Sequence, residues 1–569
     1  MRLLLPLLLA TGLSAQETLI REVYDPKTDT HVEVTALFSE PSRGGFLPVR
    51  VKISNNLKSD RSIQLRFQSS PGYMNGLSST SNFGFNAPAG KTVTQDIMVP
   101  LCSSPSTYHD EQMVNVRLTG GLGETNNMIR AKTGAANPAV LLSEALFTPN
   151  ASQLDAEITK RSGSRYGNTA FAGKFDPKQL PSDWLAFSGY DCVMLTDNDW
   201  TGMPAGSRNA ILSWVRLGGK LVVHSSTSAT LANLGLPESI GFGSVQIQSI
   251  PSDLTLVPAN TVNLASHISR VGAIRSDYSG GWPLQAVFGT KAFNYAIFVI
   301  VLIIFGILVG PVNLFVFAKS GKRHRLFVTT PIISLVASFI LVVLIIFQDG
   351  FGGRGVRRVL MEIGADGGQS AAYLHQEQFS RTGILTSGRF SVDPACLFVP
   401  VPISKSRWSR YTDDHNTKGT FNLQPSGGRM EASGDWWQSR SEHGHALSAV
   451  VATRGRIERT ATPGEFVSTF DFPIGTFYFL DESKQWHRAT DIVTGKPFTT
   501  TSVDATMVEP ELAREAAAFT NRNKQMFNRA KTRPGHFVAL TEAAPAINTL
   551  PGIRWKETKT VITGAVVKP

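Results

Sequence analysis

Two long uncharged runs in the middle of the chain constrain its fold more than any other feature. Residues 292–318 and residues 326–348 contain no Asp, Glu, Lys or Arg. A helix needs about 20 mainly apolar residues to cross a bilayer, and both runs exceed that length. A pair of buried core helices is the alternative, but soluble cores rarely supply two such runs in tandem. The sequence therefore predicts two transmembrane helices, with the lipid bilayer as a partner.

The N-terminus has the features of a secretory signal peptide. Arg2 precedes an apolar run, Leu3 to Leu13, which is too short to span a bilayer, and the small residues Ser14 and Ala15 follow it. We expect residues 1–15 to be removed by a cut after Ala15. An uncleaved anchor is the alternative.

The loop between the two predicted spans sets their orientation. Residues 319–325 carry four basic side chains and no acid, which marks a cytoplasmic loop. Three basic residues after the second span favour the opposite orientation: Arg354, Arg357 and Arg358. Acidic residues near them lower the net positive charge of that segment. We therefore expect a multi-pass protein of the cell (inner) membrane, with both its N-terminal and C-terminal regions extracytoplasmic, in the periplasm.

Composition narrows the possible partners and cofactors. The formal net charge is +11, and Arg2 with the loop accounts for nearly half of it. The remaining charge forms no basic stripe with interleaved aromatics, so we expect no nucleic acid partner. The cysteines Cys102, Cys192 and Cys396 have no metal-ligand spacing, which leaves one Cys102–Cys396 bridge as an open alternative. We expect no cofactor.

Two different patterns precede the membrane segment. In residues 16–135, apolar and polar side chains alternate, as in Phe46–Asn55, which is typical of an antiparallel β-sandwich. Residues 136–270 instead contain near-continuous apolar runs separated by helical patterns, which indicates parallel strands in an α/β layer. We interpret residues 271–291 as a linker.

The α/β region carries a family resemblance. Residues 190–199, YDCVMLTDND, and residues 211–223, ILSWVRLGGKLVV, resemble the class I glutamine amidotransferase-like fold, which implies a flavodoxin-like parallel sheet. Active members of that family have a nucleophilic Cys on a sharp turn after a strand. Here Val223 is followed by His224 and Ser225, with no Cys. We therefore expect no catalytic residue in this domain.

Ligands of such sheets bind beyond the carboxyl ends of the strands. The candidate ligand-binding residues are Asp197, Asp199, His224 and Ser225. The alternative is a membrane-anchored hydrolase that uses Ser225 or Ser226 with His224 or His267 as the base.

The whole arrangement also resembles a group of uncharacterised bacterial membrane proteins. In that group an extracytoplasmic amidotransferase-like domain precedes a transmembrane hairpin with a GP-x-N motif, which Gly310 to Asn313 match here. The resemblance implies a non-catalytic scaffold or binding protein with other membrane or envelope proteins as partners. Physically, Pro311 and Asn313 leave polar groups that a neighbouring helix must satisfy.

The chain after the membrane is again rich in strand patterns. We predict a β-rich extracytoplasmic domain over 349–505, then an amphipathic helix and terminal strands over 506–569. His443 and His445, with Asp435 or His415, could form a metal site, but surface histidines are favoured and no metal site is predicted. We expect Trp436 and Trp437 to lie in a sandwich-edge core rather than to bind sugars.

Overall fold

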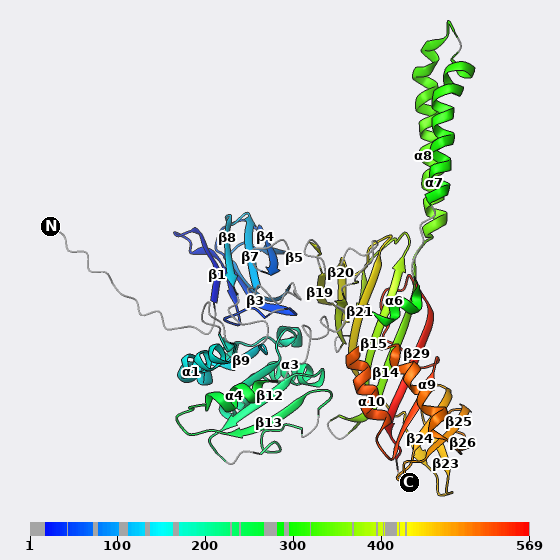
Figure 1. Ribbon diagram of the computed structural model, residues 1–569. Helices are drawn as coiled ribbons and strands as arrows, with labels where there is room; N and C mark the ends of the chain where they lie inside the picture. Colours follow the sequence, from blue (N-terminus) through cyan, green and yellow to red (C-terminus); the bar gives the residue numbers. More distant parts are fainter. Residues whose placement is uncertain are drawn as a thin grey trace, which may run out of the picture.

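The computed structural model describes residues 17–42, 44–71, 78–101, 112–130, 137–162, 170–227, 230–237, 240–266, 282–289, 295–318, 320–366, 369–393, 396–401, 403, 418–419, 421–426 and 429–567. The chain forms a multidomain, β-rich body from which one helical hairpin projects (Figure 1). The predicted leader, Cys102 and His415 lie outside the described residues, and so does His267.

The N-terminal region consists of two sheets with a common core. One sheet has the order β1-β2-β3-β6, and the other has the order β18-β5-β4-β7-β8. Alternate residues such as Val49 and Leu65 point inward and are fully buried, as the alternation predicts. The strands are β1 (Glu17–Asp25), β2 (Thr30–Ala36), β3 (Phe46–Asn55), β4 (Arg61–Pro71), β5 (Ser78–Ala87), β6 (Lys91–Pro100), β7 (Gln112–Gly120), β8 (Thr125–Arg130) and β18 (Lys418–Gly419).

The next region is a five-stranded sheet in which every pairing is parallel, with the order β10-β9-β11-β12-β13. Its strands are β9 (Val140–Ser143), β10 (Ala172–Phe175), β11 (Cys192–Thr196), β12 (Lys220–Ser225) and β13 (Ser244–Ser249), and its helices are α1 (Glu144–Ser162), α2 (Asp197–Gly202), α3 (Ala205–Arg216) and α4 (Pro258–Ala265). Along β12, Leu221 and Val223 pack in the same core as residues of α3, whereas Val222 packs with residues of α1 and α4. Helices therefore cover both faces of this sheet.

Two glycines end α3 as the sequence predicts. Gly218 has φ 113°, a conformation that glycine adopts readily. A Cβ on Gly219 would lie 2.4 Å from the Trp214 ring, so only glycine lets the indole pack there. The Gly-Gly pair thus fixes both the turn into β12 and the seat of Trp214.

The hairpin consists of α7 (Tyr295–Ile307), a π-helical segment η3 (Leu308–Phe317) and α8 (Leu326–Asp349). Val299–Phe317 and Arg323–Leu344 have mean hydropathies of 2.8 and 2.5 and are almost wholly unburied. Both are long and apolar enough to cross a membrane. The first predicted span is thus not a uniform α-helix, because Pro311 cannot donate a backbone hydrogen bond.

Asn313 joins the two helices of the hairpin. Its side chain is fully buried; its Nδ2 donates to Thr330 Oγ1 at 2.9 Å, and its Oδ1 accepts from Thr329 Oγ1 at 2.6 Å. The neighbouring helix therefore supplies the polar partners that an amide in an apolar helix requires.

A nine-stranded sheet organises the C-terminal region, with the order β17-β21-β15-β14-β29-β28-β24-β25-β27. These strands are β14 (Gly353–Asp366), β15 (Gln369–Thr382), β17 (Cys396–Val401), β21 (Glu442–Ala452), β24 (Ile474–Leu480), β25 (Trp486–Ile492), β27 (Thr501–Val503), β28 (His536–Thr541) and β29 (Ile553–Ala565). The last strand pairs in parallel with the first strand after the membrane. The predicted boundary at residues 505 and 506 therefore falls within one sheet.

Two small sheets complete this region, β16-β20-β19 and β22-β23-β26. Their strands are β16 (Phe390–Val392), β19 (Phe421–Ser426), β20 (Arg429–Gly434), β22 (Ile457–Arg459), β23 (Glu465–Ser468) and β26 (Pro497–Thr499). The prediction of one amphipathic helix here is wrong. The structure has α9 (Ala505–Ala517) and α10 (Asn521–Lys531), because the extended backbone of Thr520 breaks the helical path.

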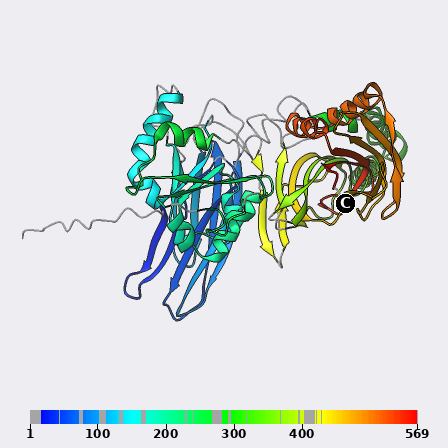
Figure 2. The same ribbon diagram turned by 90° about the horizontal axis from the view of Figure 1, so that it is seen from below.

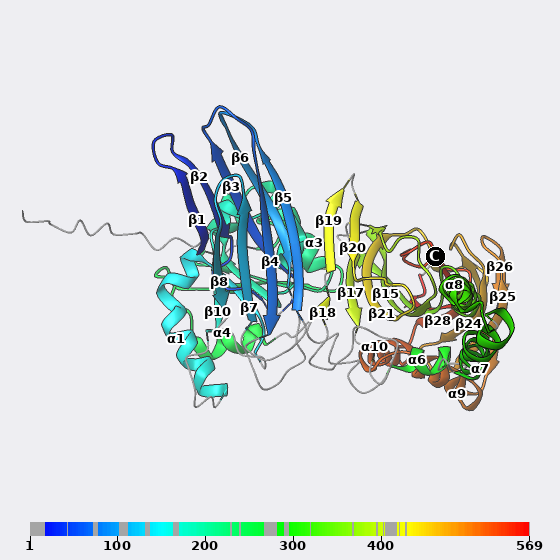
Figure 3. The same cartoon turned by 90° about the horizontal axis from the view of Figure 1, so that it is seen from above.

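The three regions outside the hairpin lie next to one another (Figures 2 and 3) and share a buried core. One buried cluster contains Phe46 from the N-terminal sheets, Trp214 from the parallel sheet region and Trp436 from the C-terminal region. In addition, the Phe242 ring lies 4.2 Å from the His375 ring, centroid to centroid. These contacts fix the relative positions of the three regions.

Candidate functional site

Ser225 and Asp197 meet at the carboxyl edge of the parallel sheet. Ser225 ends β12 and is 1% exposed, and Asp197 follows β11 directly. The Ser225 hydroxyl donates to Asp197 Oδ2 at 2.6 Å, and Ser225 Oγ accepts from the Thr227 backbone N–H at 3.1 Å. The structure thus brings together these two of the four candidate residues.

Asp199 has a local structural role. Its carboxylate accepts from the Thr196 backbone N–H at 3.0 Å, while Thr196 Oγ1 accepts from the Asp199 N–H. This reciprocal pair is a capping box that begins α2. Asp199 thus positions the helix on which Asp197 lies.

His224 lies on the opposite face of β12 from Ser225, because successive strand residues alternate sides. Its side chain is 4% exposed, and neither ring nitrogen has a hydrogen-bond partner in the described part of the chain. Burial lowers the pKa of His224 from 6.5 to about 4, so the ring is neutral at pH 7. His224 therefore does not join the Ser225–Asp197 pair.

This geometry bears on the hydrolase alternative. A serine nucleophile needs a base within hydrogen-bond reach of its hydroxyl. All hydrogen bonds that the structure gives the Ser225 hydroxyl involve Asp197 or Thr227, and none involves an imidazole. Ser226 is exposed next to this pair.

The structure adds polar residues to this edge that sequence reasoning missed. Lys174 on β10 is 8% exposed, and its Nζ lies 3.8 Å from Glu144 Oε1 at the start of α1. Ser143, at the end of β9, is fully buried, and its hydroxyl lacks a partner within the described residues. A four-residue strand such as β10 carries too little pattern to be recognised from the sequence.

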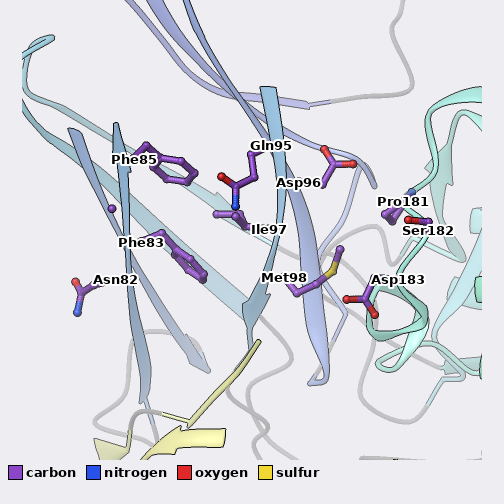
Figure 4. A pocket seen from close by; sticks show the side chains of 11 residues that line it. Asn82, Phe83, Phe85, Gln95, Asp96, Ile97, Met98, Pro181, Ser182 and Asp183 are labelled. Carbon is purple, nitrogen blue, oxygen red and sulfur yellow. The ribbon is translucent and has the colours of Figure 1, made fainter. Parts of the chain in front are cut away.

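A hollow of about 410 Å³ lies where the N-terminal sheets meet the parallel sheet region (Figure 4). Phe83 and Phe85 from β5 line one side, and Ile97 and Met98 from β6 line another. Asp183 lies at the edge, where burial raises the pKa of its carboxyl group and the Leu185 N–H opposes that rise. Polar side chains complete the lining, among them Asn82, Gln95 and Asp96.

The histidines of β21 are not on the surface, so that expectation is wrong. His443 is 8% exposed and His445 is 1% exposed, and their rings stack at 6.2 Å. His445 Nε2 lies 3.0 Å from the Trp436 carbonyl oxygen, and burial is the main cause that lowers the pKa of His445. Within the described residues, no group of three potential ligands could hold a metal ion.

The remaining predicted features of the C-terminal region are aromatic residues and thiols. Trp436 and Trp437 are 3% and 2% exposed and belong to the shared core, as predicted. Cys192 and Cys396 are both buried. The suggested Cys102–Cys396 bridge involves Cys102, which lies outside the described residues.

A second buried polar cluster is centred on Glu377, which sequence reasoning missed. Its carboxylate accepts from Thr520 Oγ1 and Asn523 Nδ2, each at 2.6 Å, and from Trp282 Nε1 at 3.1 Å. Burial is the largest cause of a raised pKa for Glu377, and these hydrogen bonds oppose it. The sequence signal is HQEQ within β15, four polar residues that all prove to be buried.

Comparisons with known proteins give no family. No family model and no curated protein matches the chain. Among solved structures, it is similar to a calcium binding mutant of Bacteroides uniformis beta-glucuronidase 2, at 11% identity and TM-score 0.15 over 39% of this chain and 28% of that chain. It is also similar to Parabacteroides merdae beta-glucuronidase with glycerol in the active site, at 10% identity and TM-score 0.14 over 35% and 36%. The chain thus spans about a third of each structure, and likenesses this low carry no functional argument.

Proposed function

We propose that this protein is a membrane-anchored, extracytoplasmic scaffold or binding protein of an envelope complex or transporter-associated assembly. The observation that carries the proposal is the apolar hairpin, whose side chains are almost wholly unburied beside three regions that share a core. Exposed apolar helices of this length are stable in lipid rather than in water. The hairpin then serves as the anchor, and the β-rich body serves as the scaffold.

Contacts at the hairpin base support an even number of spans. Before the hairpin, α6 (Pro283–Phe288) packs on the C-terminal sheet, and Arg381 Nη2 donates to the Gly289 carbonyl oxygen at 3.1 Å. After the hairpin, the Ile384 N–H donates to the Gly350 carbonyl oxygen at 2.9 Å. Both ends of the hairpin are thus attached to one domain, which favours the same side of the membrane for both. The basic loop favours the extracytoplasmic side for that domain.

We further propose that the parallel sheet region is a flavodoxin-like, amidotransferase-like unit used for docking. Numbered from its own first strand, the order β10-β9-β11-β12-β13 reads 2-1-3-4-5, the flavodoxin-like order. No Cys follows β12, and Ser225 donates to a carboxylate instead of an imidazole. Both features favour binding over catalysis at this edge, although a hydrolase that uses Ser226 is the second candidate because that serine is exposed.

A photo-crosslinking experiment tests the docking role. We place a photoreactive residue at the exposed Asn198, between Asp197 and Asp199, and a control at the exposed Lys496 in the C-terminal region. The proposal predicts a defined membrane or envelope protein crosslinked at Asn198 and not at Lys496. Labelling of Ser225 or Ser226 by a fluorophosphonate, with no crosslinked partner, would favour the hydrolase.

A further inference from the structure

The outer face of the β4–β7–β8 sheet carries an ordered polar array. Asn82, Arg66, Arg117 and Asn126 are register partners on four neighbouring strands and form one row across the sheet. Gln68 and Asn115 form the next row with Met128. All these side chains are exposed, and most of them line a hollow of about 530 Å³. We call this surface, residues Arg66, Gln68, Asn82, Asn115, Arg117 and Asn126, the arginine face.

The charges of this face are not balanced across the strands. Like charges directly opposite each other on neighbouring strands are destabilising, yet Arg66 and Arg117 are direct partners. Arg117 pairs with Glu124 in the adjoining turn, and Arg66 has no ion pair in the described part of the chain. Arg66, flanked by Arg117 and by amides, is therefore suited to binding an anion, because guanidinium groups bind phosphate bidentately.

The other sheet of the same region provides an internal comparison. On its outer face Arg21, Glu33 and Lys52 are successive cross-strand partners, so that basic and acidic residues alternate. Arg50 likewise binds Asp96 with two hydrogen bonds of 2.8 and 2.9 Å. Each of these basic residues thus has an acidic cross-strand partner, whereas the register partners of Arg66 on the arginine face are Asn82 and Arg117.

The position of the face indicates which anion it meets. β4, β7 and β8 lie on the side of the body toward which the hairpin projects, near the level of the hairpin base (Figure 1). Viewed from that side, this sheet is seen broadside, in front of the parallel sheet region (Figure 3). A hairpin that crosses a bilayer thus turns the arginine face toward the surface of that bilayer.

We propose that the arginine face docks onto anionic lipid headgroups of the bilayer that the hairpin spans. The inference rests on the proposed membrane anchoring and adds a second, electrostatic contact with the membrane. One arginine near an anionic surface strengthens docking about fivefold, and Arg66, which has no acidic partner on this face, supplies at least that factor. The contact also orients the body and its carboxyl-edge site relative to the membrane.

The test uses the full chain in lipid nanodiscs, with Cys102→Ser and a donor dye on Met128→Cys. Energy transfer to an acceptor on lipid headgroups is compared between phosphatidylcholine discs and discs that also contain phosphatidylglycerol. We expect higher transfer in the anionic discs, loss of that increase in the double variant Arg66→Gln/Arg117→Gln, and weakening by salt. Lys52→Gln, on the other sheet, is the matched control and should behave like the parent protein.

The outcomes separate this inference from the anchoring on which it rests. Failure of the chain to enter discs would contradict the membrane anchor itself. Insertion with equal transfer in both lipids, or with an unaffected double variant, would overturn docking alone. An arginine-dependent dye response to soluble polygalacturonate in neutral discs, with no response to phosphatidylglycerol, would overturn it in favour of an acidic glycan.

Discussion

Two adjacent buried residues at the end of β12 differ completely in their hydrogen bonding. Ser225 has partners in Asp197 and Thr227, whereas both nitrogens of His224 lack partners among the described residues. The sequence predicted that these neighbours point to opposite faces, because strand residues alternate. The sequence could not predict that the His224 ring lacks hydrogen-bond partners, because the groups that surround the ring come from segments far away along the chain.

His224 should make stability depend on pH. Its folded pKa of about 4 lies below 6.5, so the unfolded chain binds the extra proton as the pH falls, and stability is lost between pH 6.5 and 4. The loss amounts to about 3 kcal/mol. Urea unfolding of His224→Leu at pH 7 and at pH 4 should show a smaller loss of stability between the two pH values than in the parent protein. Its stability at pH 7 should not be lower. Val223→Ala should destabilise equally at both, and an unchanged pH dependence in His224→Leu would refute the assignment.

Ser225 should contribute to the stability of the fold and not to catalysis. Ser225→Ala removes the donor to Asp197 and should lower the free energy of unfolding by about 1–2 kcal/mol. The exposed Ser226→Ala is the control and should change stability little. We expect both variants to retain the cellular role. Loss of that role in a folded, membrane-inserted Ser225→Ala protein would argue for the hydrolase.

At the scale of elements, the sequence identified the hairpin but not the polar contacts that hold elements together. Uncharged runs predict spans directly, because length and apolarity are local properties. The partners of Glu377 on β15 include Thr520 and Trp282, which lie far away along the chain. β15 also contains four successive polar residues, so this part of its sequence lacks the alternation of apolar and polar residues that predicts a strand. Sequence periodicity therefore cannot predict which distant residues form hydrogen bonds with a buried polar group.

Asn313 should couple the two helices of the hairpin. In a double-mutant cycle in micelles, Asn313→Ala with Thr329→Val should show a coupling of about 0.6 kcal/mol and at most about 1.7 kcal/mol. The same cycle with the exposed Ser338→Ala should be additive. Additivity in both cycles would mean that the amide does not hold the helices together.

Trp282 should hold α6 against the C-terminal sheet through Glu377. Trp282→Phe keeps an aromatic ring but removes the donor to a buried carboxyl group, at a cost of about 1–3 kcal/mol. Hydrogen exchange in α6 should then become faster. Val287→Ala, at an exposed position of the same helix, should leave the exchange almost unchanged. Equal exchange in the two variants would show that this hydrogen bond does not fasten the helix.

For the whole molecule, strand and helix patterns predicted several β-rich and α/β regions around a membrane hairpin. They did not predict that the chain returns from β28 and β29 into the middle of the sheet begun by β14. They also did not predict the core that Phe46, Trp214 and Trp436 share. Such contacts join residues hundreds of positions apart, and no local pattern encodes them.

The orientation of the hairpin is the central claim, and thiol labelling in intact cells tests it most directly. Ser59, Ser320 and Ser483 are exposed and lie before, within and after the hairpin. With each replaced by Cys in a background that lacks Cys102, an impermeant reagent should label positions 59 and 483 and should reach position 320 only after the membrane is permeabilised. Labelling of position 320 alone in intact cells would contradict the proposed topology.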